Sequence, residues 1–314
     1  MKDGSVKAGI DLARRKTLSV GVALVSAKLV NLVGCDGDDT STTGSEGSGG
    51  SGGGGAGGGG TGGSGAGTGG AGGGTGGSTS TGGWATGGTA SIGDSYPDPF
   101  AGGLGTTCAL TCAAILGPCY AQTIERKDIS EGYPGLPVRL AFVVVDESCT
   151  PVEGAQVDVW HTSNRGLYSG DDSIEMCTTN DPDALAHRSF RGVQSTDAEG
   201  RVDFDTCLPG WYPGRTIHMH FTVKVGGQEY ITSQLYFPSD LITEIFSTHP
   251  DYAQFGQPDT TNEADGIYNA DGELTVAQMP DGVMLASKAI VLRSSLSDPV
   301  CGGGMGSGGP PPGG

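Results

Sequence analysis

Basic residues are scarce in this chain of 314 residues, which has 17 Lys and Arg against 35 Asp and Glu and a formal net charge of -18. Residues 95–300 by themselves hold 28 acidic and 11 basic side chains. A surface of this sign repels nucleic acids and anionic lipids, because both carry the same charge. The composition therefore predicts no nucleic-acid partner, and it is typical of a well-hydrated exported protein.

Proline is absent from the part of the chain where a fibrous protein would need it. Residues 47–88 contain 26 of the 60 glycines in 42 positions, with no proline and no three-residue period, which excludes a collagen helix. A long apolar run is also missing, since residues 17–34 are apolar but are interrupted by Lys28. This run is too short for a transmembrane helix and fits the core of a signal peptide.

The composition divides the chain into four parts. Residues 1–35 form a signal segment that ends in Leu-Val-Gly-Cys, which resembles the bacterial lipobox whose cysteine becomes lipid-modified. Residues 36–94 are a Gly/Ser/Thr-rich flexible linker, residues 95–300 are one globular domain, and residues 301–314 are a Gly/Pro-rich tail. We therefore predict an exported protein of the bacterial cell envelope, with its only membrane contact through a lipid anchor at Cys35. Signal cleavage elsewhere is the alternative, and Sec and twin-arginine export both stay open.

Seven cysteines remain if Cys35 carries lipid. An exported domain with this many cysteines is expected to form disulfides, and an odd number leaves at least one without a partner in the chain. The spacing of Cys108, Cys112 and Cys119 is also compatible with a metal knuckle, but no histidine lies near them. We therefore predict disulfides and leave their connectivity open. The other four cysteines are Cys149, Cys177, Cys207 and Cys301.

The globular part has more strand signals than helix signals. Runs of β-branched or alternating apolar residues predict strands, and they are separated by short turns. The expected strands are residues 138–145, 155–160, 202–204, 217–225, 228–237 and 288–293. Helical patterns occur only at residues 108–116 and 240–247. The fold class that follows is mainly β, a β-sandwich with few short helices.

The strand at residues 217–225 carries the clearest chemical signal. Its odd positions are all apolar and its even positions all polar, so His218 and His220 leave the sheet from the same face. The loop just before it is fixed by Gly and Pro and presents Tyr212 and Arg215, and a turn farther upstream presents Tyr168. On their own, two histidines on one face are equally compatible with an ordinary exposed strand face.

Several motifs in order resemble the intradiol ring-cleavage dioxygenases, most closely the exported, single-domain branch of that family. The resemblance covers about residues 117–238. The matching runs are residues 159–161, 166–168, 191–200, 209–221 and 232–237. The sequence departs from the family at Gly117-Pro118-Cys119-Tyr120, because Cys119 replaces the first tyrosine of a Gly-Pro-Tyr-Tyr element. The local pocket wall or disulfide pattern is therefore open.

The resemblance implies a non-haem Fe(III) site and a set of residues that hold it. The implied ligands are Tyr168, Tyr212, His218 and His220. Phenolate oxygen is a hard anionic donor that suits a ferric ion, whose charge lowers the pKa of tyrosine far enough to deprotonate it. The β-sandwich is accordingly expected to be of the intradiol dioxygenase type.

The resemblance also implies the reaction, in which O2 cleaves a catechol between its two hydroxylated carbons and yields a cis,cis-muconate-type diacid. Tyr212 is expected to leave the metal and take up a catechol proton. Arg215 is expected to stabilise charge on the substrate ring, and Gln234 to lie beside the substrate. The partners are a small aromatic diol and O2; the individual catechol and the oligomeric state are left open.

Two other classes of function remain as alternatives. A Cu/Zn superoxide dismutase-like enzyme also places an imidazole pair on a β-sandwich strand, but it needs more liganding histidines and leaves Tyr212 without a role. A non-catalytic binding or adhesion domain would hold no iron. We expect His187 and His249 to be solvated in polar loops, we assign no role to His161, and we expect Trp160 to be core packing.

Overall fold

The computed structural model describes residues 82–301. The predicted signal segment, the lipid-modified Cys35, most of the linker and the tail beyond residue 301 lie outside the described residues and stay predictions. Within residues 82–301, no helix has the length and apolar character needed to cross a membrane.

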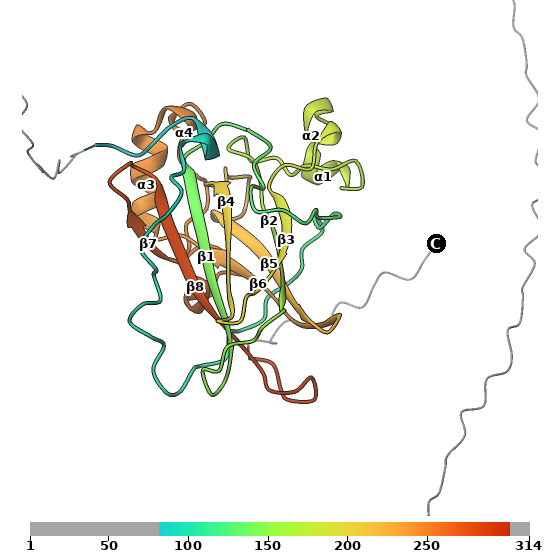
Figure 1. Ribbon diagram of the computed structural model, residues 1–314. Helices are drawn as coiled ribbons and strands as arrows, with labels where there is room; N and C mark the ends of the chain where they lie inside the picture. Colours follow the sequence, from blue (N-terminus) through green and yellow to red (C-terminus); the bar gives the residue numbers. More distant parts are fainter. Residues whose placement is uncertain (1–81, 302–314) are drawn as a thin grey trace, which may run out of the picture. The chain divides into compact units, whose positions relative to one another are not determined.

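Two four-stranded sheets stack face to face, which confirms the predicted β-sandwich (Figure 1). The first sheet has the order β4-β1-β8-β7, and the second has the order β3-β2-β5-β6. The first contains β1 (Pro137–Asp146), β4 (Arg201–Cys207), β7 (Thr275–Gln278) and β8 (Met284–Leu292). The second contains β2 (Gln156–Trp160), β3 (Arg191–Ser195), β5 (His218–Val225) and β6 (Gln228–Tyr236). All neighbouring strands are antiparallel except β1 and β8, which run parallel.

The core lies between the sheets and follows from the alternation of the strands. In β5, Met219, Phe221 and Val223 are fully buried against the other sheet. Leu140 and Phe142 of β1 meet them from the first sheet. Each such side chain contributes roughly 1.5–3 kcal/mol by leaving water. Because side chains alternate along a strand, this packing forces His218 and His220 to the opposite face of the second sheet.

The helices are short and lie outside the two sheets. They are α1 (Glu175–Thr178), α2 (Pro182–Ala186), α3 (Ser239–Thr248) and α4 (Pro250–Ala253), with 3-10 turns at Gly88–Ser91 and Ala270–Gly272. The helix predicted at residues 240–247 is confirmed as α3.

The prediction of a helix at residues 108–116 is wrong. This segment has no regular secondary structure, and backbone N–H groups in it bond to distant parts of the chain rather than to the preceding turn. The amide of Thr111 donates to the carbonyl of Val291 at 3.1 Å, and that of Ala114 donates to Thr232 at 3.0 Å. Local helical preference is weak compared with such tertiary contacts.

Three disulfides and one free thiol confirm the prediction made from the cysteine count. The disulfides are Cys108–Cys149, Cys112–Cys301 and Cys119–Cys177. Cys207 is free and buried, and burial raises the pKa of its thiol to about 12, so it stays protonated. Three disulfides are typical of proteins that fold in an oxidising compartment, and the export itself stays a prediction.

Part of the segment assigned to the linker packs on the domain. The amide of Ala85 donates to the carbonyl of Gly282 at 2.9 Å, and Trp84 packs against the core. His249 donates from Nε2 to the carbonyl of Ala85 at 2.9 Å, and its Nδ1 accepts from the amide of Asp251. His249 is only 3% exposed, so its predicted solvation is wrong, whereas His187 is exposed as expected.

Candidate metal centre

The outer face of the second sheet is buried rather than open to solvent. His218 and His220 of β5 point out of this face, yet they are 3% and 2% exposed. The segment at residues 112–121 covers them: a side-chain carbon at Gly117 would lie 3.1 Å from Cε1 of His220. The histidine pair is therefore held in a dry environment, which excludes the alternative of an ordinary exposed strand face.

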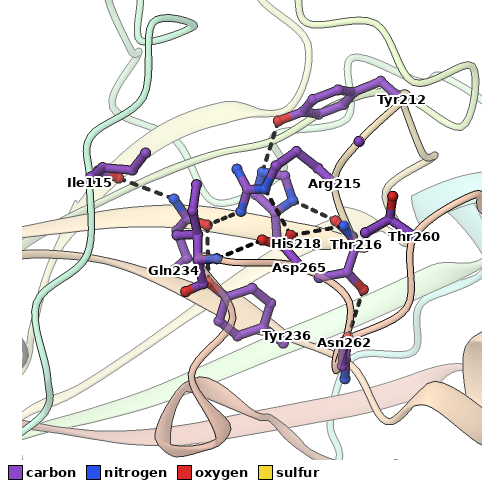
Figure 2. Close-up of polar contacts among 12 residues, drawn as sticks. Ile115, Tyr212, Arg215, Thr216, His218, Gln234, Tyr236, Thr260, Asn262 and Asp265 are labelled. Atoms are coloured by element: carbon purple, nitrogen blue, oxygen red, sulfur yellow. Dashed lines mark hydrogen bonds and ion pairs between the residues drawn. The ribbon is translucent and has the colours of Figure 1, made fainter. Parts of the chain in front are cut away.

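Two tyrosine hydroxyls meet the histidine pair in this environment. Tyr212 Oη lies 3.2 Å from Nε2 of His218, and Tyr168 Oη lies 3.5 Å from the same nitrogen. The ring centroids of His218 and His220 are 4.9 Å apart, and those of Tyr168 and His220 are 6.2 Å apart. Figure 2 shows the Tyr212 hydroxyl directed at His218. The structure thus brings all four predicted ligands together.

The two tyrosine-bearing loops press against each other, and two glycines make this approach possible. Gly166 has φ +75°, and a Cβ there would lie 2.0 Å from the carbonyl oxygen of Trp211. A Cβ at Gly210 would lie 2.3 Å from the carbonyl oxygen of Asn164, while the amide of Gly210 donates to Ser163 at 2.9 Å. Only glycine allows backbones to come this close. The loops therefore hold their tyrosines at a fixed separation.

Burial keeps all four candidate ligands neutral when no cation is present. Burial raises the pKa of Tyr168 well above its ordinary value. Burial, with a smaller effect from the Arg215 cation, lowers the pKa of His218 to about 3. His218 donates from Nδ1 to the carbonyl of Thr216 at 2.7 Å, which leaves the lone pair of Nε2 facing the tyrosines.

The residues present fit a ferric ion. Two phenol oxygens and two imidazole nitrogens form a hard donor set, and a highly charged cation favours the phenolate form that burial opposes. The buried Nδ1 of His220 has no hydrogen-bond partner among the described residues. Such an orphaned polar atom is expected where a site is completed by a group other than the chain itself.

Arg215 is fixed beside the cluster by a carboxylate that the sequence did not reveal. Its Nε donates to Oδ2 of Asp265 at 2.8 Å, and its Nη2 donates to Oε1 of Gln234 at 2.6 Å (Figure 2). Burial alone would raise the pKa of Asp265, but hydrogen bonds from Arg215 and from two backbone amides hold it below its ordinary value. Gln234 in turn donates to the carbonyl of Ile115 in the covering segment at 3.1 Å. Two of the three predicted catalytic residues, Arg215 and Gln234, therefore contact each other.

Trp160 packs on the candidate centre and not in the main core. It is fully buried and stacks on His220, with ring centroids 5.0 Å apart and planes 9° apart. Tyr120 meets its edge at 4.9 Å and donates a hydrogen bond to Oδ2 of Asp158 at 3.0 Å. Burial raises the pKa of Asp158 to about 6. Asp158 was missed by the sequence analysis, although its position two residues before Trp160 places it on the same strand face.

The three histidines outside the pair form hydrogen bonds away from the candidate centre. A Cu/Zn superoxide dismutase-like site would therefore find no further histidine ligand among them. His161 donates from Nδ1 to the carbonyl of Thr162 at 2.8 Å and accepts at Nε2 from Thr206 at 2.8 Å. Burial lowers its pKa to about 3, so it is neutral. His161 is therefore a satisfied buried residue.

Comparison with known proteins confirms the resemblance to the intradiol dioxygenases. Residues 115–248 match the model of a protein family described as dioxygenase. The chain is 33% identical over 157 residues to the protocatechuate 3,4-dioxygenase beta chain of Burkholderia cepacia, covering 45% of this chain and 63% of that one. It is 25% identical over 162 residues to catechol 1,2-dioxygenase 1 of Acinetobacter lwoffii, covering 44% and 50%. The chain thus spans half to less than two thirds of these relatives.

A solved structure agrees in fold over nearly its whole length. It is the intradiol ring-cleavage dioxygenase from Tetranychus urticae, with 27% identity and a TM-score of 0.53. The match covers 59% of this chain and 95% of that chain. The match therefore includes nearly all of that protein's fold.

Replacing Gly166 with alanine should disrupt the contact between the two tyrosine loops. Gly166 and Gly214 both have positive φ, so an alanine at either position is strained by about 1–2 kcal/mol. Only at Gly166 does the new Cβ also meet a backbone oxygen, whereas nothing lies within 4 Å of it at Gly214. We expect Gly166→Ala to lower the free energy of unfolding by more than ~3 kcal/mol and Gly214→Ala by less than half of that, measured by denaturant unfolding. Equal losses would contradict the proposed close approach.

The buried Asp158 should make stability depend on pH. Its pKa is higher in the folded protein than in the unfolded chain, so the folded state loses stability as pH rises through 4 to 6 and the carboxyl ionises. Asp158→Asn removes this dependence because the amide stays neutral. We expect the melting temperature of the wild type to fall relative to Asp158→Asn between pH 4 and pH 7. The control is Glu153→Gln, which changes an exposed carboxylate. A constant difference in melting temperature between the wild type and Asp158→Asn would refute this prediction. The same trend between the wild type and Glu153→Gln would refute it as well.

Proposed function

Starting from the relatedness to intradiol dioxygenases, we propose that the domain is a non-haem Fe(III) dioxygenase that inserts both atoms of O2 into a catechol-type diol. The product is a cis,cis-muconate-type diacid. The observation that carries this proposal is the convergence of Tyr168, Tyr212, His218 and His220 at one buried point beside Arg215. The relatives, named as protocatechuate and catechol dioxygenases, support the reaction class.

The four residues would hold the ferric ion, which when bound supplies a Lewis-acid site that takes the catechol oxygens and makes the ring electron-rich enough to react with O2. Tyr168 is 2% exposed and is enclosed by packed side chains, so it stays in place. Tyr212 is only partly buried and lies in the loop before β5. We therefore assign to Tyr212 Oη the uptake of a catechol proton.

Arg215 supplies a fixed positive charge where negative charge develops on the substrate. Burial raises the pKa of Tyr212, and the charge of the neighbouring Arg215 acts against this rise. The hydrogen bonds to Asp265 and Gln234 prevent the guanidinium from swinging out. A fixed donor of this kind is worth roughly 3–4 kcal/mol of barrier in a water-excluded site.

Colour provides a direct test of the ligand set. We expect the iron-loaded wild type to be red-brown through tyrosinate-to-iron charge transfer. Tyr212→Phe should lose part of the absorbance, because Tyr168 remains as a ligand, and most of the catechol-dependent oxygen uptake, with the fold retained by circular dichroism. The control is Tyr252→Phe, which changes a fully buried tyrosine whose hydroxyl donates to the carbonyl of Leu208. A colourless wild type with no iron by elemental analysis would refute the proposal and favour a non-catalytic binding domain.

The charges around the centre favour uncharged catechols over carboxylated ones. Arg215 is already neutralised by Asp265, and Arg165, close to Tyr168 in the chain, is paired with Asp181 at 2.6 Å. Both of these arginines are paired, so neither is a free cation that could compensate a substrate carboxylate for its lost hydration, and the unpaired Arg191 lies behind the Tyr168 ring. The covering segment instead exposes two apolar side chains, Ile115 and Leu116, at 44% and 43%.

Oxygen uptake over a panel of diols tests this preference. We expect kcat/KM for catechol and 4-methylcatechol to exceed that for protocatechuate by at least about tenfold, equivalent to about 1.4 kcal/mol. A preference for protocatechuate would overturn the substrate assignment and leave the reaction class intact. No uptake with any of the three by an iron-loaded sample would overturn the reaction class.

A further inference from the structure

Arg191 lies directly behind Tyr168 and has no role in the site described above. It is the first residue of β3, it pairs with Trp160 across the sheet, and it is fully buried. The Cζ atom of its guanidinium lies 5.8 Å from the centroid of the Tyr168 ring, on the face of the ring. A cation at this distance interacts favourably with an electron-rich aromatic ring.

The hydrogen bonds of Arg191 all go to uncharged oxygens. Nε donates to the carbonyl of Ser169 at 2.9 Å, and Nη2 donates to the carbonyl of Cys119 at 2.9 Å and to Oγ of Ser173 at 3.0 Å. Nη1 has no hydrogen-bond partner among the described residues. The guanidinium is therefore buried without a carboxylate bonded to it.

Burying the Arg191 charge in this way costs more free energy than burying the charge of Arg139, the other buried arginine among the described residues. Arg139, which is 8% exposed on the first sheet, contacts the carboxylates of Asp205 at 2.5 Å and Asp203 at 3.1 Å. Taking a charge out of water costs several kcal/mol unless good partners compensate for the loss. Arg139 has such partners within its own sheet, whereas Arg191 bonds only to dipoles and lies on the ring of Tyr168, and the carboxylates of Asp172 and Asp158 act on it without a hydrogen bond.

The contacts of Arg191 connect three separate segments around Tyr168. Its own strand is one, the loop that continues from Tyr168 through Ser173 is the second, and the covering segment at Cys119 is the third. The disulfide Cys119–Cys177 joins the second and third segments again, and the amide of Tyr168 donates to the carbonyl of Cys177 at 2.9 Å. The backbone of Tyr168 is thus fixed on both sides.

We propose that Arg191 is a positioning residue for Tyr168, which holds the Tyr168 loop in place and lays a fixed positive charge beneath the tyrosine ring. The electrostatic part rests on the proposed function, in which Tyr168 is an iron ligand. The mechanical part does not, because the hydrogen bonds to Ser169, Cys119 and Ser173 exist without any metal.

Two variants separate the charge from the hydrogen bonds. Arg191→Gln removes the charge, and Arg191→Lys keeps it but cannot reach three acceptors from one planar group. The matched control is Arg139→Gln, which removes a buried arginine of the other sheet. All variants are prepared as the full chain with the disulfides oxidised.

The first measurement is hydrogen–deuterium exchange of the iron-free protein in the peptide covering residues 166–178. We expect exchange to be at least about tenfold faster in Arg191→Gln and in Arg191→Lys, because each variant loses hydrogen bonds that hold the loop in place. Arg139→Gln should exchange like the wild type in this peptide. Wild-type protection in both Arg191 variants would overturn the mechanical part.

The second measurement is the charge-transfer absorption of the iron-loaded protein. Without the positive charge an electron leaves the tyrosine oxygen more easily, so the band of Arg191→Gln should move to longer wavelength, while those of Arg191→Lys and Arg139→Gln should stay near the wild type. An unshifted band in Arg191→Gln would overturn the electrostatic part. If Arg191→Gln does not fold, Arg191→Lys and Ser173→Ala decide the mechanical part, and wild-type exchange in both would overturn it. A wild type that takes up no iron would refute the proposed function and leave the exchange result standing.

Discussion

Burial of both faces of the second sheet is the constraint on which the rest of the domain depends. The inner face is apolar and forms the core with the first sheet. The outer face is polar, and the segment at residues 112–121 excludes water from it. Polar groups in a dry environment must find partners or change their protonation state, because they lose their hydration. The neutral histidines, the protonated tyrosines and the raised pKa of Asp158 are all consequences of this burial.

The covering segment stays in place because covalent bonds hold it at both ends. Cys112 is bonded to Cys301 and Cys119 to Cys177, so only six residues of chain, 113–118, separate the two attachment points. Between them the carbonyl of Ile115 accepts from Gln234, which also accepts from Arg215. Contacts thus connect the covering segment, through Gln234, to Arg215 beside the tyrosines. A change in the conformation of the covering segment is therefore expected to alter the position of Arg215.

Much of this arrangement was predictable from local sequence. Alternation in β5 placed His218 and His220 on one face, and the glycines near the tyrosines indicated tight turns. Local patterns did not reveal three features of the structure. Asp265 pairs with Arg215 from 50 residues away, His249 bonds to a segment assigned to the linker, and the apolar pattern at residues 108–116 belongs to a segment without regular secondary structure. In each case a contact distant in sequence outweighed a short-range preference.

The sequence by itself determined the donors, their order along the chain and the face from which the histidine pair leaves the sheet. These properties depend on residue identity and on the two-residue period of a strand, both of which are local. Only the tertiary structure decided that the two tyrosine loops touch, that the histidine face is covered, and that a buried arginine lies beneath Tyr168. Each of these joins segments that no periodicity relates, such as Arg191 and Cys119, 72 residues apart, so it follows from how the whole chain packs.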